Sequence, residues 1–143
     1  MRRLLLIVAA AAAAVSCGRE VPAEREAYPV DETYRRGPVS FRAALSRDTI
    51  TIAEHVTMLL EVTAREGYTA ELPRFGEKLE QFGIVDYETH RPELRGDTVV
   101  TRRLYELEPF LSGDYAIPPM AVRFRAEGDS LVYTVESDTL RVR

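Results

Sequence analysis

The chain has 143 residues, of which 45% are hydrophobic and 29% charged, and its formal net charge is −4 at pH 7. This size predicts one domain, since domains usually contain about 100–200 residues. The acidic balance excludes the basic face with which nucleic-acid-binding proteins displace counterions. Because Cys17 is the single cysteine, no disulfide can form within the chain, and the core must be stable without one.

The N-terminal residues have the pattern of a secretory signal. Arg2 and Arg3 precede an apolar run from Leu4 to Val15, shorter than the roughly 20 residues that span a bilayer as a helix. The run ends in Ala14-Val15-Ser16-Cys17, which resembles the processing site of a bacterial lipoprotein, where the cysteine receives lipid and becomes the new N-terminus. The pattern predicts cleavage of residues 1–16 and lipid on Cys17. The alternative is an unmodified thiol beside a conventional cleavage site.

Lipid on Cys17 predicts a protein that is anchored to a bacterial membrane outside the cytoplasm, with the periplasmic face favoured. Several acyl chains make such an anchor stable, because one chain alone binds only marginally. Residues 17–38 are interpreted as the lipidated cysteine and a flexible tether, since prolines and charges of both signs leave too few apolar residues to pack. Arg35 and Arg36 are interpreted as solvated charges of this tether.

From Val39 onward the apolar residues recur with the period of two that is typical of half-buried antiparallel strands. The clearest example is Val56–Ala64, in which Leu59 is the one apolar residue on the polar face. Further strands are expected at Phe41–Leu45, Thr49–Ile52, Tyr68–Leu72, Ile84–Thr89, Thr98–Leu107, Asp114–Ile117, Met120–Arg125, Ser130–Val135 and Thr139–Val142. A turn is expected from Pro92 to Asp97, and only Arg74–Gln81 has the composition of a helical turn.

Short strands separated by turns predict an all-β fold, an immunoglobulin-like antiparallel β-sandwich of about 7–9 strands over residues 39–143. Tyr115 follows a Pro/Gly turn in a way that resembles the tyrosine corner of such sandwiches, in which a buried ring returns its hydroxyl to nearby backbone. Pro118-Pro119 cannot donate to a strand ladder, so this pair predicts an edge or a point where the chain changes sheet.

Several motifs together resemble the N-terminal domain of BatD proteins, the bacterial aerotolerance (oxygen-tolerance) family. They are Glu71–Gly76, Gly83–Val85, Leu107–Pro109 and Gly113–Pro119, and the Leu-x-Pro and Gly-x-Tyr-x-Ile-Pro-Pro parts are the most specific. The resemblance covers about Val39 to Val142. It implies an immunoglobulin-like fold on the outer side of the cytoplasmic membrane, without established catalytic residues.

The same resemblance implies partners among envelope proteins, namely von Willebrand factor A-type membrane proteins and a MoxR-type ATPase system. Family members usually carry several such domains and a C-terminal transmembrane helix. The printed chain stops at Arg143, so lipid on Cys17 is expected to replace that helix as the anchor.

Two pairs of carboxylates have the spacing of catalytic candidates. Asp86 with Glu88, and Glu106 with Glu108, are spaced two apart, which places each pair on one strand face about 7 Å apart. This separation overlaps that of inverting glycosidases, at about 6.5–9.5 Å. However, neighbours on one strand point side by side and do not face each other across a cleft. Both pairs are interpreted as solvated strand surface, and no enzymatic activity is predicted.

The two histidines do not predict a metal site. His55 and His90 both fall on outward positions, whereas structural zinc needs four ligands and catalytic zinc three with water. Glu88 and Asp86 share the face of His90 and would form at most a weak divalent site. We therefore assign no catalytic, metal or cofactor-binding residue, and expect no cofactor.

The remaining class of function is binding, and the sequence predicts a non-enzymatic protein-interaction module of the cell envelope. Pro73, Phe75 and Gly76 form a candidate interaction loop, because loops on rigid sandwiches often carry recognition. The alternative, which we favour for this loop, is that Leu72, Phe75 and Phe82 cap one end of the core. An exposed edge strand is a second candidate surface. The competing function is a solute- or glycan-binding lipoprotein, which would need a concave face with clustered tyrosines.

Overall fold

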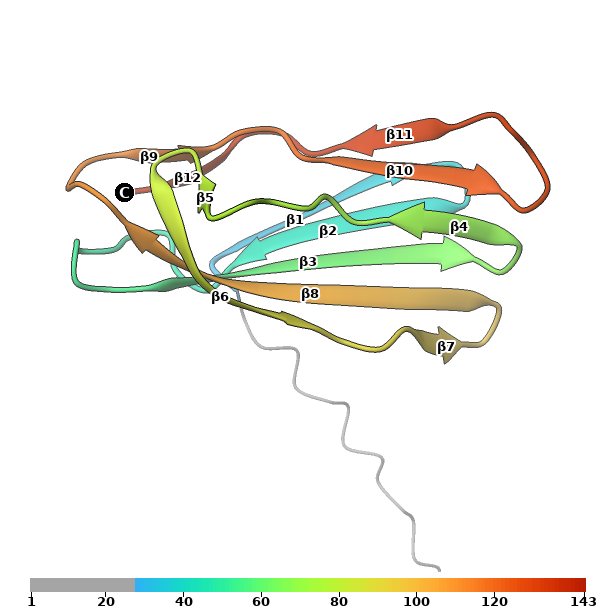
Figure 1. Cartoon of the computed structure of the whole chain (residues 1–143), viewed down its shortest axis with the longest axis horizontal. Helices are drawn as coiled ribbons and strands as arrows, with labels where there is room; N and C mark the ends of the chain where they lie inside the picture. Colours follow the sequence, from blue (N-terminus) through green and yellow to red (C-terminus); the bar gives the residue numbers. More distant parts are fainter. Residues whose placement is uncertain (1–27) are drawn as a thin grey trace, which may run out of the picture.

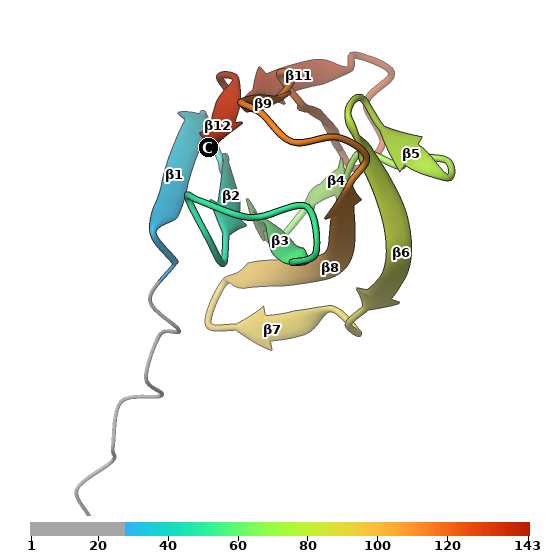
Figure 2. The ribbon, with the colours of Figure 1, turned by 90° about the vertical axis from the view of Figure 1, so that its left-hand side faces the viewer.

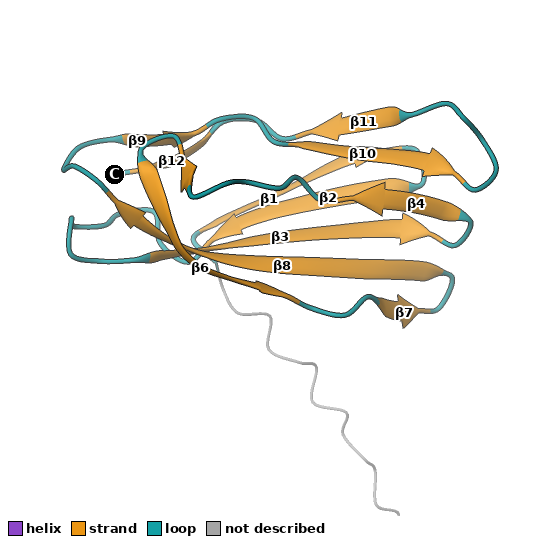
Figure 3. Ribbon diagram, in the orientation of Figure 1, coloured by secondary structure: helices purple, strands orange, loops and turns teal. Residues whose placement is uncertain are grey.

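The computed structural model describes residues 28–143, so residues 1–16, Cys17 and the first part of the predicted tether lie outside the described residues. The described part of the chain consists of strands joined by loops and contains no helix, as Figure 3 shows. The strands are β1 (Val30–Arg36), β2 (Val39–Leu45), β3 (Val56–Arg65), β4 (Tyr68–Glu71), β5 (Lys78–Leu79), β6 (Phe82–Thr89), β7 (Glu93–Arg95), β8 (Thr98–Pro109), β9 (Tyr115–Ile117), β10 (Ala121–Ala126), β11 (Tyr133–Glu136) and β12 (Leu140–Val142). The all-β prediction is confirmed, with more strands than expected.

The strands form a sandwich in which every pairing is antiparallel. The large sheet has seven strands in the order β1-β2-β3-β8-β6-β5, with β7 also paired to β8. A three-stranded sheet, β11-β10-β4, and a two-stranded sheet, β12-β9, form the opposite layer, as Figure 1 shows. The end view in Figure 2 shows that the large sheet curls around the core, with β6 and β5 closing one side. The predicted β-sandwich is therefore confirmed.

The core lies between the two layers and is built from alternate residues of the strands. In β3 every second residue from Val56 to Ala64 is buried, as the period of two predicts. Phe41 and Phe82 of the large sheet are fully buried, and Val122 and Phe124 of β10 belong to the same buried cluster from the opposite layer. Burying each side chain of this size contributes about 1.5–3 kcal/mol, which makes this core the main source of stability.

Strand β1 corrects the predicted boundary between tether and domain. Val30–Arg36 pairs with β2 along its whole length, and Gly37, with a φ of 55°, forms the turn between them. Val30 and Tyr34 are half-buried against the core, with the Tyr34 ring 6.3 Å from that of Phe41. The tether prediction is therefore wrong for these residues. Two apolar side chains are too few to reveal a strand that depends on backbone pairing.

Arg36, which the sequence placed in the tether, contacts the opposite layer. Its Nη1 donates to the backbone oxygen of Thr134 at 2.5 Å. Its guanidinium carbon also lies 5.6 Å from the centre of the Tyr133 ring, a cation–π contact. Strand β1 is therefore joined to β11 at its C-terminal end and is not a solvated tail.

The strand predicted at Thr49–Ile52 does not form, and these residues belong to the loop between β2 and β3. The Ile50 N–H donates to the backbone oxygen of Arg143 at 2.7 Å, and the Arg143 N–H donates to that of Asp48 at 2.8 Å. The β-branched residues favoured a strand locally. In the fold, these bonds hold the segment beside the C-terminal residue and no extended ladder forms.

Two further segments differ from their predicted conformation. Arg74–Gln81 contains no helical turn and instead includes β5, which pairs with Phe82 and Gly83 of β6. The turn expected from Pro92 to Asp97 includes β7, which pairs with β8 and leaves Gly96, with a φ of 62°, in the turn between them. In both places a short strand forms because a neighbouring strand is close enough to pair, which local composition does not show.

The prolines after β9 mark a change of sheet. Strand β9 pairs with β12, whereas β10 pairs with β4 and β11. Pro118 and Pro119 lie between β9 and β10, and neither has a backbone N–H to donate to a ladder. The prediction of a break at this pair is confirmed.

Candidate interaction surface

The outer face of the large sheet carries a row of alternating charges across three strands. The register pairs Arg42 of β2 with Glu61 of β3, and Glu61 with Arg102 of β8. Arg102 donates Nε to the Glu61 carboxylate, and Arg42 donates Nε and Nη2 to Asp31 at 2.7 and 2.8 Å. The hydrogen bond to Asp31 raises the pKa of Arg42 above its ordinary value. Both guanidinium groups of this row are therefore already bound to carboxylates.

Strand β7 extends this network. Arg95 Nη2 lies 2.8 Å from Glu93 Oε2, and the other carboxylate oxygen of Glu93 lies 3.9 Å from Arg102 Nη1. The hydrogen bond from Arg95 lowers the pKa of Glu93 below its ordinary value. The pair lies at the surface, where solvent screens such interactions.

An apolar row lies beside the charged one. Ala44, Leu59 and Leu104 are paired across β2, β3 and β8, and Ala44 is 0% and Leu59 7% exposed. The sequence placed Leu59 on the solvent side, and it does lie on the outer face. Its side chain is buried nevertheless, because neighbouring strands flank β3 on both sides.

Except for Ala44, the residues of these two rows line an open hollow of about 1160 Å³ on the outer face of the large sheet. Among its described lining residues Tyr28 is the only tyrosine, so the clustered tyrosines expected of a glycan site do not lie here. Arg42 and Arg102, which also line the hollow, already hold carboxylates. An anionic ligand would have to displace these partners.

The two carboxylate pairs singled out in the sequence lie side by side. The register places Asp86 of β6 directly opposite Glu106 of β8, while Glu108 lies opposite Gly83. All four carboxylates are on exposed residues, and His55 Nδ1 lies 2.7 Å from Glu106 Oε1. The fold therefore joins the two pairs into one exposed acidic strip along β6 and β8, and they do not face each other across a cleft.

His90 follows β6 and is tied to the same strip. Its backbone N–H donates to the oxygen of Arg102 at 3.1 Å. Its Nε2 is buried and lies 3.5 Å from Glu88 Oε1, but it has no hydrogen-bond partner among residues 28–143. Within these residues no group of three or more His, Cys, Asp or Glu side chains is arranged to hold a metal ion.

The candidate interaction loop packs largely against the core. Phe75 is half-buried, and its ring centre lies 5.3 Å from that of Tyr105 in an edge-on arrangement. The backbone oxygen of Pro73 accepts a hydrogen bond from Arg103 Nη1 at 3.2 Å, whereas Gly76 is exposed. Leu72 and Phe82 are buried, so the capping alternative describes this segment. Only its surface around Gly76 is free for contact.

Tyr115 lies at the start of β9 and is 4% exposed. Its ring centre lies 5.0 Å from that of Phe82, which is fully buried. Its hydroxyl has no hydrogen-bond partner within residues 28–143, whereas a tyrosine corner would supply one. The contribution that the structure shows for Tyr115 is therefore the packing of its ring.

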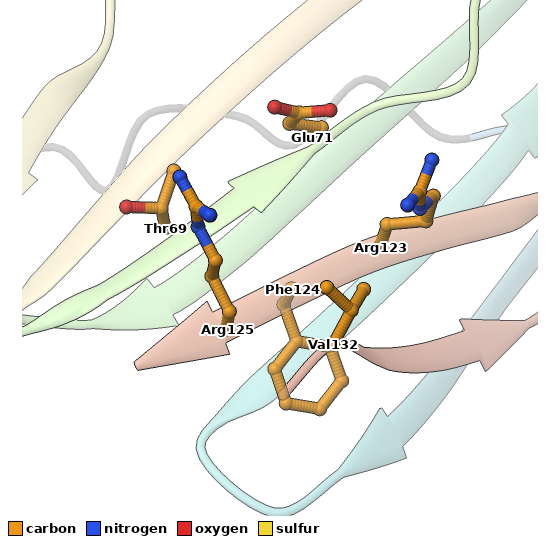
Figure 4. A pocket seen from close by; sticks show the side chains of 6 residues that line it. All are labelled: Thr69, Glu71, Arg123, Phe124, Arg125 and Val132. Atoms are coloured by element: carbon orange, nitrogen blue, oxygen red, sulfur yellow. The ribbon is translucent and has the colours of Figure 1, made fainter. Parts of the chain in front are cut away.

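A smaller hollow lies on the outer face of the three-stranded sheet, as Figure 4 shows. Arg123 of β10 lies opposite Glu71 of β4, and Arg125 lies opposite Thr69. The volume of this hollow is about 160 Å³. This is below the roughly 300–1,000 Å³ typical of pockets that enclose a small molecule.

The sequence did not reveal which residues meet on the outer faces. The pairing of Arg42 with Asp31 and of Arg102 with Glu61 depends on strand registers that join residues 11 and 41 positions apart in the chain. Alternating opposite charges on predicted strands were the available signal, but local alternation does not determine which strands are neighbours.

No family model, curated protein or solved structure matches this chain. The part of the chain that the structure describes has no helical segment with the length and apolar character needed to span a bilayer.

Proposed function

We propose that this protein is a membrane-anchored extracytoplasmic lipoprotein whose β-sandwich is a non-enzymatic protein-interaction module of the cell envelope. The observation that carries the proposal is the open edge of the large sheet along β6, where residues 85–89 are exposed beside the acidic strip. An exposed strand edge on a rigid sandwich is a recurring platform for protein recognition. The signal-like N-terminus, ending in Cys17, supports the location.

The resemblance to the N-terminal domain of BatD proteins supports partners in an aerotolerance or stress-related membrane complex. By that resemblance they are von Willebrand factor A-type membrane proteins and a MoxR-type ATPase system. An immunoglobulin-like sandwich is compatible with this role, although such folds serve many functions.

Anchoring is tested by Cys17→Ser in the full chain. We expect the unaltered protein to sediment with membranes and to carry acyl chains on the N-terminal residue by mass spectrometry. The Cys17→Ser variant should be released into the soluble fraction, because it cannot form the thioether-linked lipid. An unmodified thiol on a soluble protein would contradict the proposed location.

The interaction role is tested by site-specific crosslinking in intact membranes. Photoreactive residues placed along β6 should form adducts with envelope proteins, identified by mass spectrometry. The alternative, a solute- or glycan-binding lipoprotein, is favoured only by the hollow on the large sheet. A specific sugar or small-molecule ligand, with no protein adduct at any surface position, would favour that alternative.

A further inference from the structure

Strand β6 is an open edge of the large sheet over its second half. Strand β5 pairs with β6 only at Phe82 and Gly83, and the Ile84 N–H then donates to the oxygen of Glu77 at 2.9 Å. After Ile84, the described strands pair with β6 only on the β8 side. Val85 and Tyr87 are 48% and 65% exposed, which is unusual for large apolar residues on a strand.

The backbone of this segment has groups that point away from β8. The register shifts at a bulge between Ile84 and Asp86, and His90 then donates its N–H to Arg102 of β8. In an antiparallel ladder, alternate residues direct both backbone groups toward the same neighbour. The backbone N–H and C=O groups of Glu88 therefore point toward β8, as those of His90 do. The backbone groups of Tyr87 and Thr89 point to the free edge.

The side chain of Asp86 occupies one of these free groups. Its Oδ1 accepts a hydrogen bond from the Tyr87 N–H at 2.8 Å. This is the donor that a carbonyl of an added strand would bind. The Asp86 carboxylate therefore blocks nonspecific strand addition at this edge. A strand that pairs with Tyr87 would displace this carboxylate, which could then contact side chains of the added strand.

The outer side of the edge is acidic. Asp86 and Glu88 lie on this side, and Asp86 is directly opposite Glu106, an arrangement of like charges that costs stability. A strand added beside β6 would place every second side chain next to Asp86 and Glu88. Lysine or arginine at these positions would relieve the repulsion, and acidic residues would increase it.

The inner side of the edge is aromatic. The ring centre of Tyr87 lies 6.2 Å from that of Tyr105, and Phe75 packs on Tyr105. Because Tyr87 is largely exposed, its ring is free to contact inward-facing side chains of an added strand. Apolar or aromatic residues would fit between the basic ones.

We propose that the β6 edge binds an extended segment of a partner protein in which lysine or arginine alternates with apolar residues. The segment would pair with the backbone of Tyr87 and Thr89 and extend the large sheet. This inference rests on the proposed interaction role and adds its site and the chemistry of the partner. A second copy fits poorly, because two β6 strands paired about Tyr87 would place Asp86 against another Glu88.

The test uses the full chain in detergent and two labelled peptides of about seven residues, a typical strand length. The first alternates lysine with valine and tyrosine, and the second has glutamate in place of each lysine. We expect saturable binding of the first peptide, weakened by salt, and no measurable binding of the second. Equal binding of both peptides would overturn the charge argument.

Two sets of variants test the edge itself. Asp86→Asn with Glu88→Gln keeps the side-chain shapes and should weaken binding of the lysine peptide about tenfold. Thr89→Pro removes an N–H that β8 does not use and should abolish binding, whereas Thr89→Ala should retain it. Circular dichroism and thermal unfolding check that each variant folds. Unchanged affinity in the folded variants, or a dimer that Thr89→Pro dissociates, would overturn the proposal.

The two proposals fail in different ways. Absence of lipid and of any protein adduct in membranes would contradict the proposed function, whatever the peptides show. Protein adducts that map only to the outer face of the small sheet, together with no peptide binding, would contradict the β6 site and leave the interaction role standing.

Discussion

A buried tyrosine usually contributes to stability both by packing of its ring and by a hydrogen bond of its hydroxyl, and at Tyr115 only the first is seen. The ring packs at 5.0 Å against Phe82, while the hydroxyl has no hydrogen-bond partner within residues 28–143. Burial of an aromatic ring contributes through area and ring contact, whereas a hydrogen bond contributes about 1 kcal/mol net. Substitutions that remove the hydroxyl or the whole ring should therefore differ clearly.

We expect Tyr115→Phe to change the free energy of unfolding by less than about 0.5 kcal/mol, and Tyr115→Ala to lower it by about 3 kcal/mol or more. Urea unfolding of both variants measures the difference. If Tyr115→Phe cost about 1 kcal/mol or more, the hydroxyl would make a bond of the tyrosine-corner type after all.

Glu61 offers a second test at the scale of single residues. Its side chain is 16% exposed and that of Arg102 is 28% exposed, so the pair is partly shielded from solvent. A double-mutant cycle with Glu61→Gln and Arg102→Met should give a coupling energy of about 1 kcal/mol. The more exposed pair of Arg95 and Glu93 is the matched control and should show little coupling. Equal coupling in both cycles would contradict the role of shielding.

At the scale of elements, β1 shows how a strand forms with little apolar content. It pairs with β2 at seven positions, and Val30 and Tyr34 are its only residues packed against the core. Without it, β2 would be an exposed edge of the large sheet. The sequence placed the start of the domain at residue 39, whereas the structure includes β1. Chains that start at either boundary can therefore be compared for stability.

We expect a chain beginning at residue 39 to be less stable by about 2 kcal/mol than one beginning at residue 28, because Val30 and Tyr34 return to water. It should also associate more readily through the edge of β2. Chemical denaturation and size-exclusion chromatography measure both effects. Identical unfolding curves for the two chains would show that β1 contributes nothing to the fold.

The Glu54 carboxylate bridges the loop between β2 and β3, in addition to the backbone bonds of this loop with Arg143. Glu54 Oε2 accepts the Thr51 N–H at 2.8 Å, and Oε1 lies 2.7 Å from Arg47 Nη1. The hydrogen bonds from the backbone and side chain of Thr51, and after them the charge of Arg47, lower the pKa of Glu54 below its ordinary value. The loop lacks a strand ladder, so this carboxylate is one of the few groups that hold it in place.

For the whole molecule, the lowered pKa values of Glu54 and Glu93 predict a dependence of stability on pH. Both groups bind a proton less tightly in the folded state, so their contribution is present above the unfolded pKa and is lost as pH falls through the folded pKa. We expect the free energy of unfolding to fall in this acidic range. The variant Glu54→Gln with Glu93→Gln should show a smaller fall by urea unfolding, and an unchanged profile would contradict the assignment.

The position of β1 also changes the expected geometry of anchoring. If lipid is attached at Cys17, the segment before β1 has 12 residues, from Gly18 to Pro29, and not the 21 of the longer tether. The shorter segment would hold the sandwich closer to the membrane.

The alternation of apolar residues determined the all-β class, the inward face of β3 and the break at Pro118-Pro119, because these features depend on residues close together in the chain. Pairing between distant strands cannot be obtained from such patterns. For this reason β1, β5 and β7 were missed, and Thr49–Ile52 was wrongly predicted to be a strand.

The sequence by itself determined that the chain is acidic, that its alternating segments form strands carrying two pairs of carboxylates, and that a signal-like run precedes them. Only the tertiary structure decided that Asp86 lies opposite Glu106, that Tyr87 and Thr89 direct backbone groups to a free edge, and that Arg42 and Arg102 are already bound to carboxylates. The physical reason is that strand register and strand neighbours are set by packing of the whole core, which joins residues far apart in the chain.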